Sequence, residues 1–206
     1  MNKRLISRVV VLLLTAPFLS ASARSGPGES SSLNLLPEPK EMTIRVGEYF
    51  RLGPKTRIIV QLGHQEEDRI AAETLAEDVA EHSGLKLNIV GAKATSKAEQ
   101  GAIMLVRLQD ARVRKFLAGK GLRVDAVTGR QGYLLFSDES HLIVAANTGE
   151  GLFSGVQTLR QLLREDGKNL ICPGVTIRDW PNFEGDNAQN GDDRDTVVKV
   201  VVGPGN

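Results

Sequence analysis

The sequence predicts an α+β domain built on one mixed, largely antiparallel sheet, with two main helices packed on one face. Three observations lead to this prediction. Short β-branched runs recur between residues 43 and 178, two segments with helical periodicity lie among them at residues 66–83 and 151–164, and glycines follow the ends of predicted elements. Because the order is strands, helix, strands, hairpin, helix and strand, with no internal repeat, it favours a layered α+β arrangement.

The first half of this domain is predicted to contain strands and one long helix. Residues 43–46 and 49–52 flank Gly47-Glu48 and predict a short hairpin, and residues 57–62 form a β-branched strand. A helix is predicted over residues 66–83 because two parallel rows of apolar residues recur every four positions within it. Gly84 follows directly, as a C-terminal cap should.

The second half is predicted to alternate short strands with helical segments. In order, we expect strands at 86–90 and 102–108, one or two helical turns at 110–117, a hairpin of 133–136 with 142–146, a helix at 151–164 closed by Gly167, and a last strand at 175–178.

The helix at residues 151–164 has an unusually wide apolar arc. Leu152 lies at its centre, Phe153 and Leu162 lie near its two edges, and the arc spans about half of the circumference. A helix lying on one sheet needs a stripe little wider than about 100°. The width therefore predicts cover on two sides, although packing in a groove beside the first helix is an alternative explanation.

The N-terminus is predicted to be a secretory signal peptide covering residues 1–23. Lys3, Arg4 and Arg8 are basic, residues 9–19 are mostly apolar, and Ala21-Ser22-Ala23 fits a cleavage site. Eleven residues are too few to span a membrane, which takes about 20. We therefore expect export to the periplasm or the extracellular space with no membrane attachment after signal removal. Residues 24–32 are polar and rich in Gly and Ser, so residues 24–35 are predicted to be a flexible lead-in.

Composition excludes some partners. A formal net charge of +1 gives no electrostatic argument for binding nucleic acid or an anionic membrane. Cys172 is the only cysteine, so the chain has no internal disulfide, and its apolar neighbours predict a buried, unreactive thiol.

Residues that could carry chemistry lack the context it needs. The glycine-rich turn at 147–155 lies between a strand and a helix, like a dinucleotide-binding turn, but no acidic residue ends a following strand, so close helix–sheet packing explains its glycines better. His64, His82 and His141 share no metal-ligand spacing, and a pair of His82 with Asp78 predicts a solvated ion pair.

The acidic groups have similarly structural explanations. Glu66-Glu67-Asp68 suit the first turn of a helix, Asp138-Glu139 fall in a hairpin turn, and Asp192-Asp193 fall in the tail. A calcium loop starting at Asp186 fails because Ala188 and Val197 occupy ligand positions. We therefore assign no catalytic, cofactor-binding or metal-binding residue from the sequence.

Three motifs carry a family resemblance. They are Leu36-Pro37-Glu38-Pro39-Lys40, Gly151-Leu152-Phe153-Ser154-Gly155-Val156-Gln157-Thr158-Leu159-Arg160-Gln161-Leu162-Leu163, and Ile177-Arg178-Asp179-Trp180-Pro181-Asn182-Phe183. Residues 36–183 resemble the N-terminal α/β domain that precedes the catalytic barrel in the β-N-acetylhexosaminidases of glycoside hydrolase family twenty. The resemblance implies that the helices lie between the sheet and the barrel, which is the partner of this domain in a full-length relative.

The resemblance ends where the family's barrel begins. An arginine that contacts the terminal sugar follows the last motif in the family, whereas this chain has Asp186 there. A barrel needs about 250 residues, so it does not fit here, and the family's catalytic Asp-Glu pair has no counterpart. Residues 184–206 form an irregular tail with a β-prone run at 196–202, which a truncation, a shifted reading frame or a natural end would each explain.

Two functional hypotheses follow. The first is the non-catalytic N-terminal domain of an exported β-N-acetylhexosaminidase, truncated and inactive alone. The second is a free-standing extracytoplasmic module that binds carbohydrate or protein. If the barrel is missing, Phe153 and Leu162 lose part of their cover, and together with the β-prone run they predict self-association.

Overall fold

The structure is a computed structural model of the chain. It describes residues 33–63, 65–93, 99–124, 130–167, 169–180 and 197–202. The predicted signal peptide, most of the lead-in and the tail as far as residue 196 lie outside these residues. Leu33 and Leu35, which fall within the predicted lead-in, are buried against the core, so the packed domain begins by Leu33.

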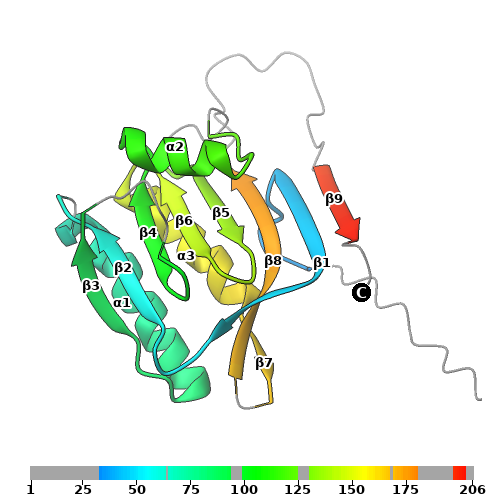
Figure 1. Cartoon of the computed structure of the whole chain (residues 1–206), viewed down its shortest axis with the longest axis horizontal. Coiled ribbons are helices and arrows are strands. Elements are labelled where there is room, and N and C mark those ends of the chain that lie inside the picture. Colours follow the sequence, from blue (N-terminus) through cyan, green and yellow to red (C-terminus); the bar gives the residue numbers. More distant parts are fainter. Residues whose placement is uncertain are drawn as a thin grey trace, which may run out of the picture. The chain divides into compact units, whose positions relative to one another are not determined.

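One sheet organises the domain (Figure 1). Its strands are β1 (Glu41–Leu52), β2 (Arg57–Gln61), β3 (Asn88–Ala92), β4 (Ile103–Arg107), β5 (Tyr133–Ser137), β6 (Leu142–Ala146), β7 (Arg164–Asp166), β8 (Asn169–Asp179) and β9 (Val197–Val202). Their spatial order is β3-β2-β4-β6-β5-β8-β1-β9. β7 is not part of this order and pairs with β8. The helices are α1 (Gln65–Ser83), α2 (Ala111–Gly119) and α3 (Gly149–Leu162).

The prediction of a single mixed sheet in an α+β fold is confirmed. β8 runs antiparallel to β1, β5 and β7, and β5 runs antiparallel to β6. The β3-β2-β4-β6 half of the sheet is parallel, as is the β1–β9 pair. The hairpin predicted between residues 133–136 and 142–146 is the β5–β6 pair.

The hairpin predicted at residues 43–52 is wrong, because both of its halves belong to the continuous strand β1. Arg45 pairs with Gly174 of β8, and Tyr49 pairs with the next residue, Pro173, so residues 46–48 form a bulge. Gly47 has a φ of 89°, which suits a tight reversal as well as a bulge. β8 is long enough to pair with both halves, and that tertiary pairing determines the outcome.

The helices divide between the two faces of the sheet. α1 and α3 bury their apolar residues in the larger core, which includes Leu75, Val79, Leu152 and Leu159, and this confirms two main helices on one face. α2 covers β4, β5 and β6 on the opposite face through a smaller core that contains Leu117.

α3 lies close to the sheet because two of its three glycines, Gly151 and Gly155, lie where a side chain would clash with the sheet or the segment before it. A Cβ atom on Gly151 would lie 2.5 Å from the carbonyl oxygen of Gly132, and one on Gly155 would lie 2.4 Å from Cγ1 of Val144. These distances confirm close helix–sheet packing as the reason for the glycines.

The wide apolar arc of α3 is accounted for largely within the domain. Leu162 is fully buried in the larger core, which also contains residues of α1 and of the sheet. The expectation that Leu162 loses its cover is therefore wrong, whereas Phe153 is 37% exposed. α3 ends at Leu162, and Gly167 lies in the turn between β7 and β8 instead of closing the helix.

The β-prone run near the C-terminus is not isolated. Residues 197–202 form β9, which pairs in parallel with Glu41–Val46 of β1. Val200 and Val201 remain exposed on this edge strand. Lys199 pairs in register with Thr43, so its side chain is on the α2 face of the sheet.

Candidate functional site

The first and last of the three sequence motifs meet where β1 begins and β8 ends. Glu41 pairs in register with Arg178, and their side chains form an ion pair. The backbone N–H of Lys40 donates to Oδ1 of Asp179 at 3.3 Å, and the Lys40 ammonium lies 5.3 Å from the centre of the Trp180 ring. The residues at which the chain enters and leaves the domain are thus held together.

Asp179 and its neighbour Tyr133 are part of this junction and are partly or fully buried. Burial raises the pKa of the Asp179 carboxyl, although hydrogen bonds from the backbone of Lys40 and Trp180 act in the opposite direction. Burial also raises the pKa of Tyr133, whose hydroxyl lies 2.6 Å from Oγ1 of Thr158 on α3. The last motif strand is therefore connected to the motif helix through these polar contacts.

A buried ion pair joins β4 to the start of α1. Nε and Nη2 of Arg107 donate to the carboxylate of Asp68 over 2.6–3.1 Å, and Asp68 is fully buried. Arg107 also donates to Glu67 at 2.7 Å and to the carbonyl oxygen of Asn147 at 2.9 Å. Burial alone would lower the pKa of Arg107, but the hydrogen bonds from its guanidinium to Asp68 and Glu67 raise it overall.

Sequence reasoning missed this pair, because it assigned Asp68 to the helix dipole. The sequence does contain a signal for this pair, in the spacing between Asp68 and the apolar residues of the same helix. Asp68 lies four positions before Ala72 and seven before Leu75, on the stripe that faces the sheet, and Arg107 is the only charged residue in β4. A charge at each of two core positions indicates a buried pair.

A second polar cluster lies between the C-terminal halves of α1 and α3. Asp78 accepts a hydrogen bond from Arg160 at 2.5 Å, and Nδ1 of His82 lies 2.8 Å from the backbone oxygen of Asp78. Nδ1 is 3.8 Å from the Asp78 carboxylate, so the predicted pair is present as an exposed interaction. These residues line a hollow of about 420 Å³, and the hydrogen bond to Asp78 raises the pKa of His82.

The remaining candidates from the sequence are structural. Oδ1 of Asp138 accepts from the backbone N–H groups of Ser140 and His141, at 2.8 and 2.7 Å, and so shapes the β5–β6 turn. Burial acts to raise the pKa of Asp138, but these hydrogen bonds and those with Lys120 and the His141 ring lower it overall. Burial raises the pKa of Cys172 to about 12, which keeps the thiol protonated and unreactive.

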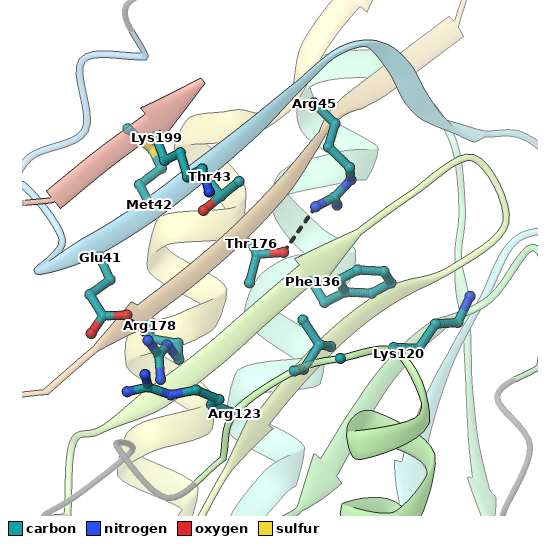
Figure 2. A pocket seen from close by; sticks show the side chains of 12 residues that line it. Glu41, Met42, Thr43, Arg45, Lys120, Arg123, Phe136, Thr176, Arg178 and Lys199 are labelled. Carbon is teal, nitrogen blue, oxygen red and sulfur yellow. Dashed lines mark hydrogen bonds and ion pairs between the residues drawn. The ribbon is translucent and has the colours of Figure 1, made fainter. Parts of the chain in front are cut away.

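A groove on the α2 face of the sheet gathers basic side chains (Figure 2). We call it the cationic groove. It has a volume of about 360 Å³, and its basic lining residues are Arg45, Lys120, Arg123, Arg178 and Lys199. Glu41 is the only acidic residue among those that line it in the described part of the chain.

Within the described ranges, no group of three or more His, Cys, Asp or Glu side chains is placed to hold a metal ion. None of the helices in the same ranges has the length and apolar character needed to cross a membrane. His64, Asp186 and Asp192-Asp193 lie outside the described residues.

Comparison with known families assigns the chain. The family model for glycosyl hydrolase family 20, domain 2, matches residues 32–180, which is most of the chain. The chain belongs to glycosyl hydrolase family 20.

Individual relatives agree with this assignment. A β-hexosaminidase from Porphyromonas gingivalis is 26% identical over 164 residues, covering 76% of this chain and 18% of that protein. A β-hexosaminidase from Vibrio furnissii is 35% identical over 63 residues, covering 31% of this chain and 10% of that protein. The chain therefore spans less than a fifth of the length of these curated relatives.

A solved structure supports the fold. The family 20 β-N-acetylhexosaminidase from Streptomyces coelicolor matches with a TM-score of 0.52 and 25% identity, covering 71% of this chain and 26% of that one. The family 20 match in this chain ends at residue 180, next to the junction that holds Lys40, Asp179 and Trp180 together.

Proposed function

We propose that residues 33–180 act as the non-catalytic domain of an exported β-N-acetylhexosaminidase that takes part in the breakdown of glycans containing N-acetylglucosamine or N-acetylgalactosamine. The observation that carries this proposal is the match of residues 32–180 to domain 2 of family 20, in relatives of which the chain spans a small part. The partner of this domain is then the catalytic domain of the enzyme.

The outer surface of the two main helices supports this partnership. α1 and α3 pack together on one face of the sheet, and each exposes an apolar side chain: Ile70 is 64% exposed and Phe153 is 37% exposed. A contiguous exposed apolar patch is a feature of surfaces that another domain covers, and under this proposal these two side chains belong to such a patch. We propose that the catalytic domain packs on this helical surface.

The chemistry of the described residues supports a domain that is inactive by itself. General acid catalysis needs a carboxyl group placed within reach of the glycosidic oxygen. The buried or half-buried carboxylates of Asp68, Asp78 and Asp138 are engaged by Arg107, Arg160 and backbone N–H groups. We propose that these groups stabilise the fold and take no part in hydrolysis.

An activity assay tests the proposal directly. We expect no release of nitrophenol when the purified chain is incubated with the nitrophenyl β-glycosides of N-acetylglucosamine and N-acetylgalactosamine. A mock purification from the same host without the gene is the control for contaminating hexosaminidase. Turnover that rises in proportion to this chain, and is absent from the mock sample, would overturn the proposal.

A chimaeric enzyme tests the partnership. Residues 33–180 replace the corresponding domain of the Streptomyces coelicolor enzyme, and we expect a soluble, active hexosaminidase. Changing Phe153 to Glu in the chimaera should reduce soluble yield and activity, because the charge is buried at the interface. The matched control is Lys115→Glu on α2, on the opposite face of the sheet. If Phe153→Glu behaves like Lys115→Glu, the helical surface does not bind the catalytic domain.

Export is the second part of the proposal, and it rests on the signal-like residues 1–23. We expect the secreted protein to begin at Arg24, as measured by its intact mass. Recovery of the full-length chain from the cytoplasm alone would contradict export.

A further inference from the structure

The chain leaves the matched domain at the end of β8. Asp179 is the last residue of β8, and the family match ends at the next residue, Trp180. β8 lies between β5 and β1 in the sheet (Figure 1). Asp179 pairs in register with Tyr133 of β5, so both side chains project to the face that α3 covers. A carboxyl group is thus placed where the exit of the chain, the sheet and α3 meet.

We propose that Asp179 is a positioning residue, which fixes the direction of the chain as it leaves the domain and thereby helps to orient the catalytic domain. The catalytic domain belongs to the proposed function, on which this orienting role rests, whereas the fixed exit rests on the contacts of Asp179 alone. In this role Asp179 acts without touching the substrate.

The carboxylate of Asp179 joins the exit of the chain to its entry. Its Oδ1 accepts the backbone N–H of Lys40, just before β1, at 3.3 Å, and the carboxylate also accepts the backbone N–H of Trp180. The Lys40 ammonium lies 5.3 Å from the centre of the Trp180 ring. Trp180 is therefore held through its backbone by Asp179 and through its ring by Lys40. Each carboxylate oxygen can accept about two hydrogen bonds, which suits a group that faces several donors.

A second set of contacts joins the exit to α3. The Tyr133 hydroxyl hydrogen-bonds to the Asp179 carboxylate and lies 2.6 Å from Oγ1 of Thr158 on α3. When Tyr133 donates to Asp179, the Thr158 hydroxyl donates to Tyr133, so the three side chains form one chain of hydrogen bonds. Tyr133 is buried, and a Cβ atom on Gly155 of α3 would lie 3.1 Å from its ring. Close packing therefore holds the Tyr133 ring in place.

This chain of hydrogen bonds connects the two places at which the catalytic domain would be attached. One is the covalent link after Trp180, and the other is the proposed docking surface on α1 and α3, to which Phe153 belongs. Domains of one chain move relative to each other unless a connection or an interface restrains them. A connection that already points in the docked direction reduces the entropy that docking costs. A fixed exit therefore favours a single docked arrangement.

Stabilising the fold does not by itself require a carboxyl group at this position. Backbone pairing with β1 and β5 already holds β8 in the sheet, and burial of the carboxyl group is unfavourable for its charged form. A directional acceptor is required, in contrast, to fix the N–H groups of Lys40 and Trp180 relative to each other. The arrangement therefore favours a role in orientation.

Trp180 is the only tryptophan in the chain, so its fluorescence reports on the exit directly. In the full chain, we expect Asp179→Asn to raise the acrylamide quenching constant of Trp180 by about twofold and to lower its fluorescence anisotropy, because an amide has one acceptor oxygen in place of two. Tyr133→Phe, which removes only the hydroxyl group, should give a smaller increase. The matched control is Asp166→Asn on β7, which breaks an exposed ion pair with Arg51 and should leave the quenching unchanged.

The chimaera with the Streptomyces coelicolor enzyme tests the orientation of the catalytic domain. Double electron–electron resonance measures the distance between a spin label on Lys115→Cys, which is exposed on α2, and a label on the catalytic domain, after other exposed cysteines of that domain are replaced. Cys172 is buried and needs no replacement. We expect a narrow distance distribution that Asp179→Asn broadens and Asp166→Asn does not, with unchanged far-ultraviolet circular dichroism.

Three results would overturn the proposal. They are a quenching constant of Asp179→Asn equal to that of Asp166→Asn, a distance distribution that Asp179→Asn leaves narrow, and a distribution that is already broad without the substitution. An unchanged quenching constant together with a lowered urea midpoint would show that Asp179 only stabilises the fold. An insoluble chimaera would count against the proposed partnership, whereas quenching of Trp180 in the full chain decides the role of Asp179 independently.

Discussion

Removing the charge of Asp68 should destabilise the domain more than any other single change to an ion pair described here. In Asp68→Asn, Arg107 remains buried but loses the carboxylate that binds two of its nitrogens at 2.6–3.1 Å. The two side chains are 0% and 4% exposed, so water cannot replace the lost partner. Breaking one partner of a buried pair costs about 3–5 kcal/mol.

The structure places the expected cost near the lower end of that range. Arg107 keeps its contacts with Glu67 at 2.7 Å and with the carbonyl oxygen of Asn147 at 2.9 Å. We therefore expect the free energy of unfolding to fall by about 3 kcal/mol. Glu67→Gln is the matched control, because Glu67 binds the same guanidinium but its side chain is 68% exposed, and its loss should cost at most about 1 kcal/mol.

Equilibrium unfolding in urea, followed by far-ultraviolet circular dichroism, measures both effects. With a slope of about 2 kcal/mol per molar urea, Asp68→Asn should lower the midpoint by about 1.5 M. The double variant Asp68→Leu, Arg107→Met should lose clearly less than the sum of its single changes, since it leaves no unpaired buried charge. A loss for Asp68→Asn no larger than that for Glu67→Gln would refute the reasoning, as would strict additivity in the double variant.

Two further predictions concern packing and pH. Gly155→Ala should lower the free energy of unfolding by about 1–3 kcal/mol, because the new Cβ would lie 2.4 Å from Val144. Gly119→Ala on α2 is the control: its Cβ meets nothing within 4 Å, so the change should be neutral or stabilising by up to about 1 kcal/mol. Urea unfolding of both variants measures the difference. The pKa of His82 is raised by Asp78, so its contribution to stability is present below about pH 6.5 and is lost as the pH rises through the folded-state pKa. The difference in unfolding free energy between the wild type and His82→Gln should therefore be larger at about pH 5.5 than at about pH 8.5, and an equal difference at both would contradict this assignment.

Much of the local structure follows from the sequence. α1 is predicted within one residue of its bounds, because its apolar rows and the glycine after it are local signals; Gly84 has a φ of 71° and donates to the Ala80 carbonyl. The β5–β6 hairpin follows from two apolar runs and a polar turn in which Asp138 binds the backbone. The close helix–sheet packing that the sequence predicts for the glycine-rich turn is confirmed, because Cβ atoms on Gly151 and Gly155 would clash with neighbouring atoms.

The family could also be predicted from the sequence. The structure adds that its first and last motifs, which are far apart in the chain, lie side by side. Lys40 belongs to the first motif and Asp179 to the last, separated by most of the domain, yet they share a hydrogen bond. Periodicity cannot reveal such a contact. The antiparallel register of β1 and β8 places the two residues together.

How the elements combine depends on contacts between residues that are far apart in the chain. Residues 43–52 carry a turn signal at Gly47, but the length of β8 turns it into a bulge within one strand. Leu162 is buried in the larger core, and the helix's own pattern cannot identify the elements that cover it. Taken alone, Asp68 is explained by the helix dipole and Arg107 is a single cation in a strand. They become a pair only when α1 packs on the sheet. Periodicities, caps and turns can be predicted from the sequence, because they depend on residues within a few positions of one another. Pairing across the sheet depends instead on which surfaces remain to be buried after the local elements form.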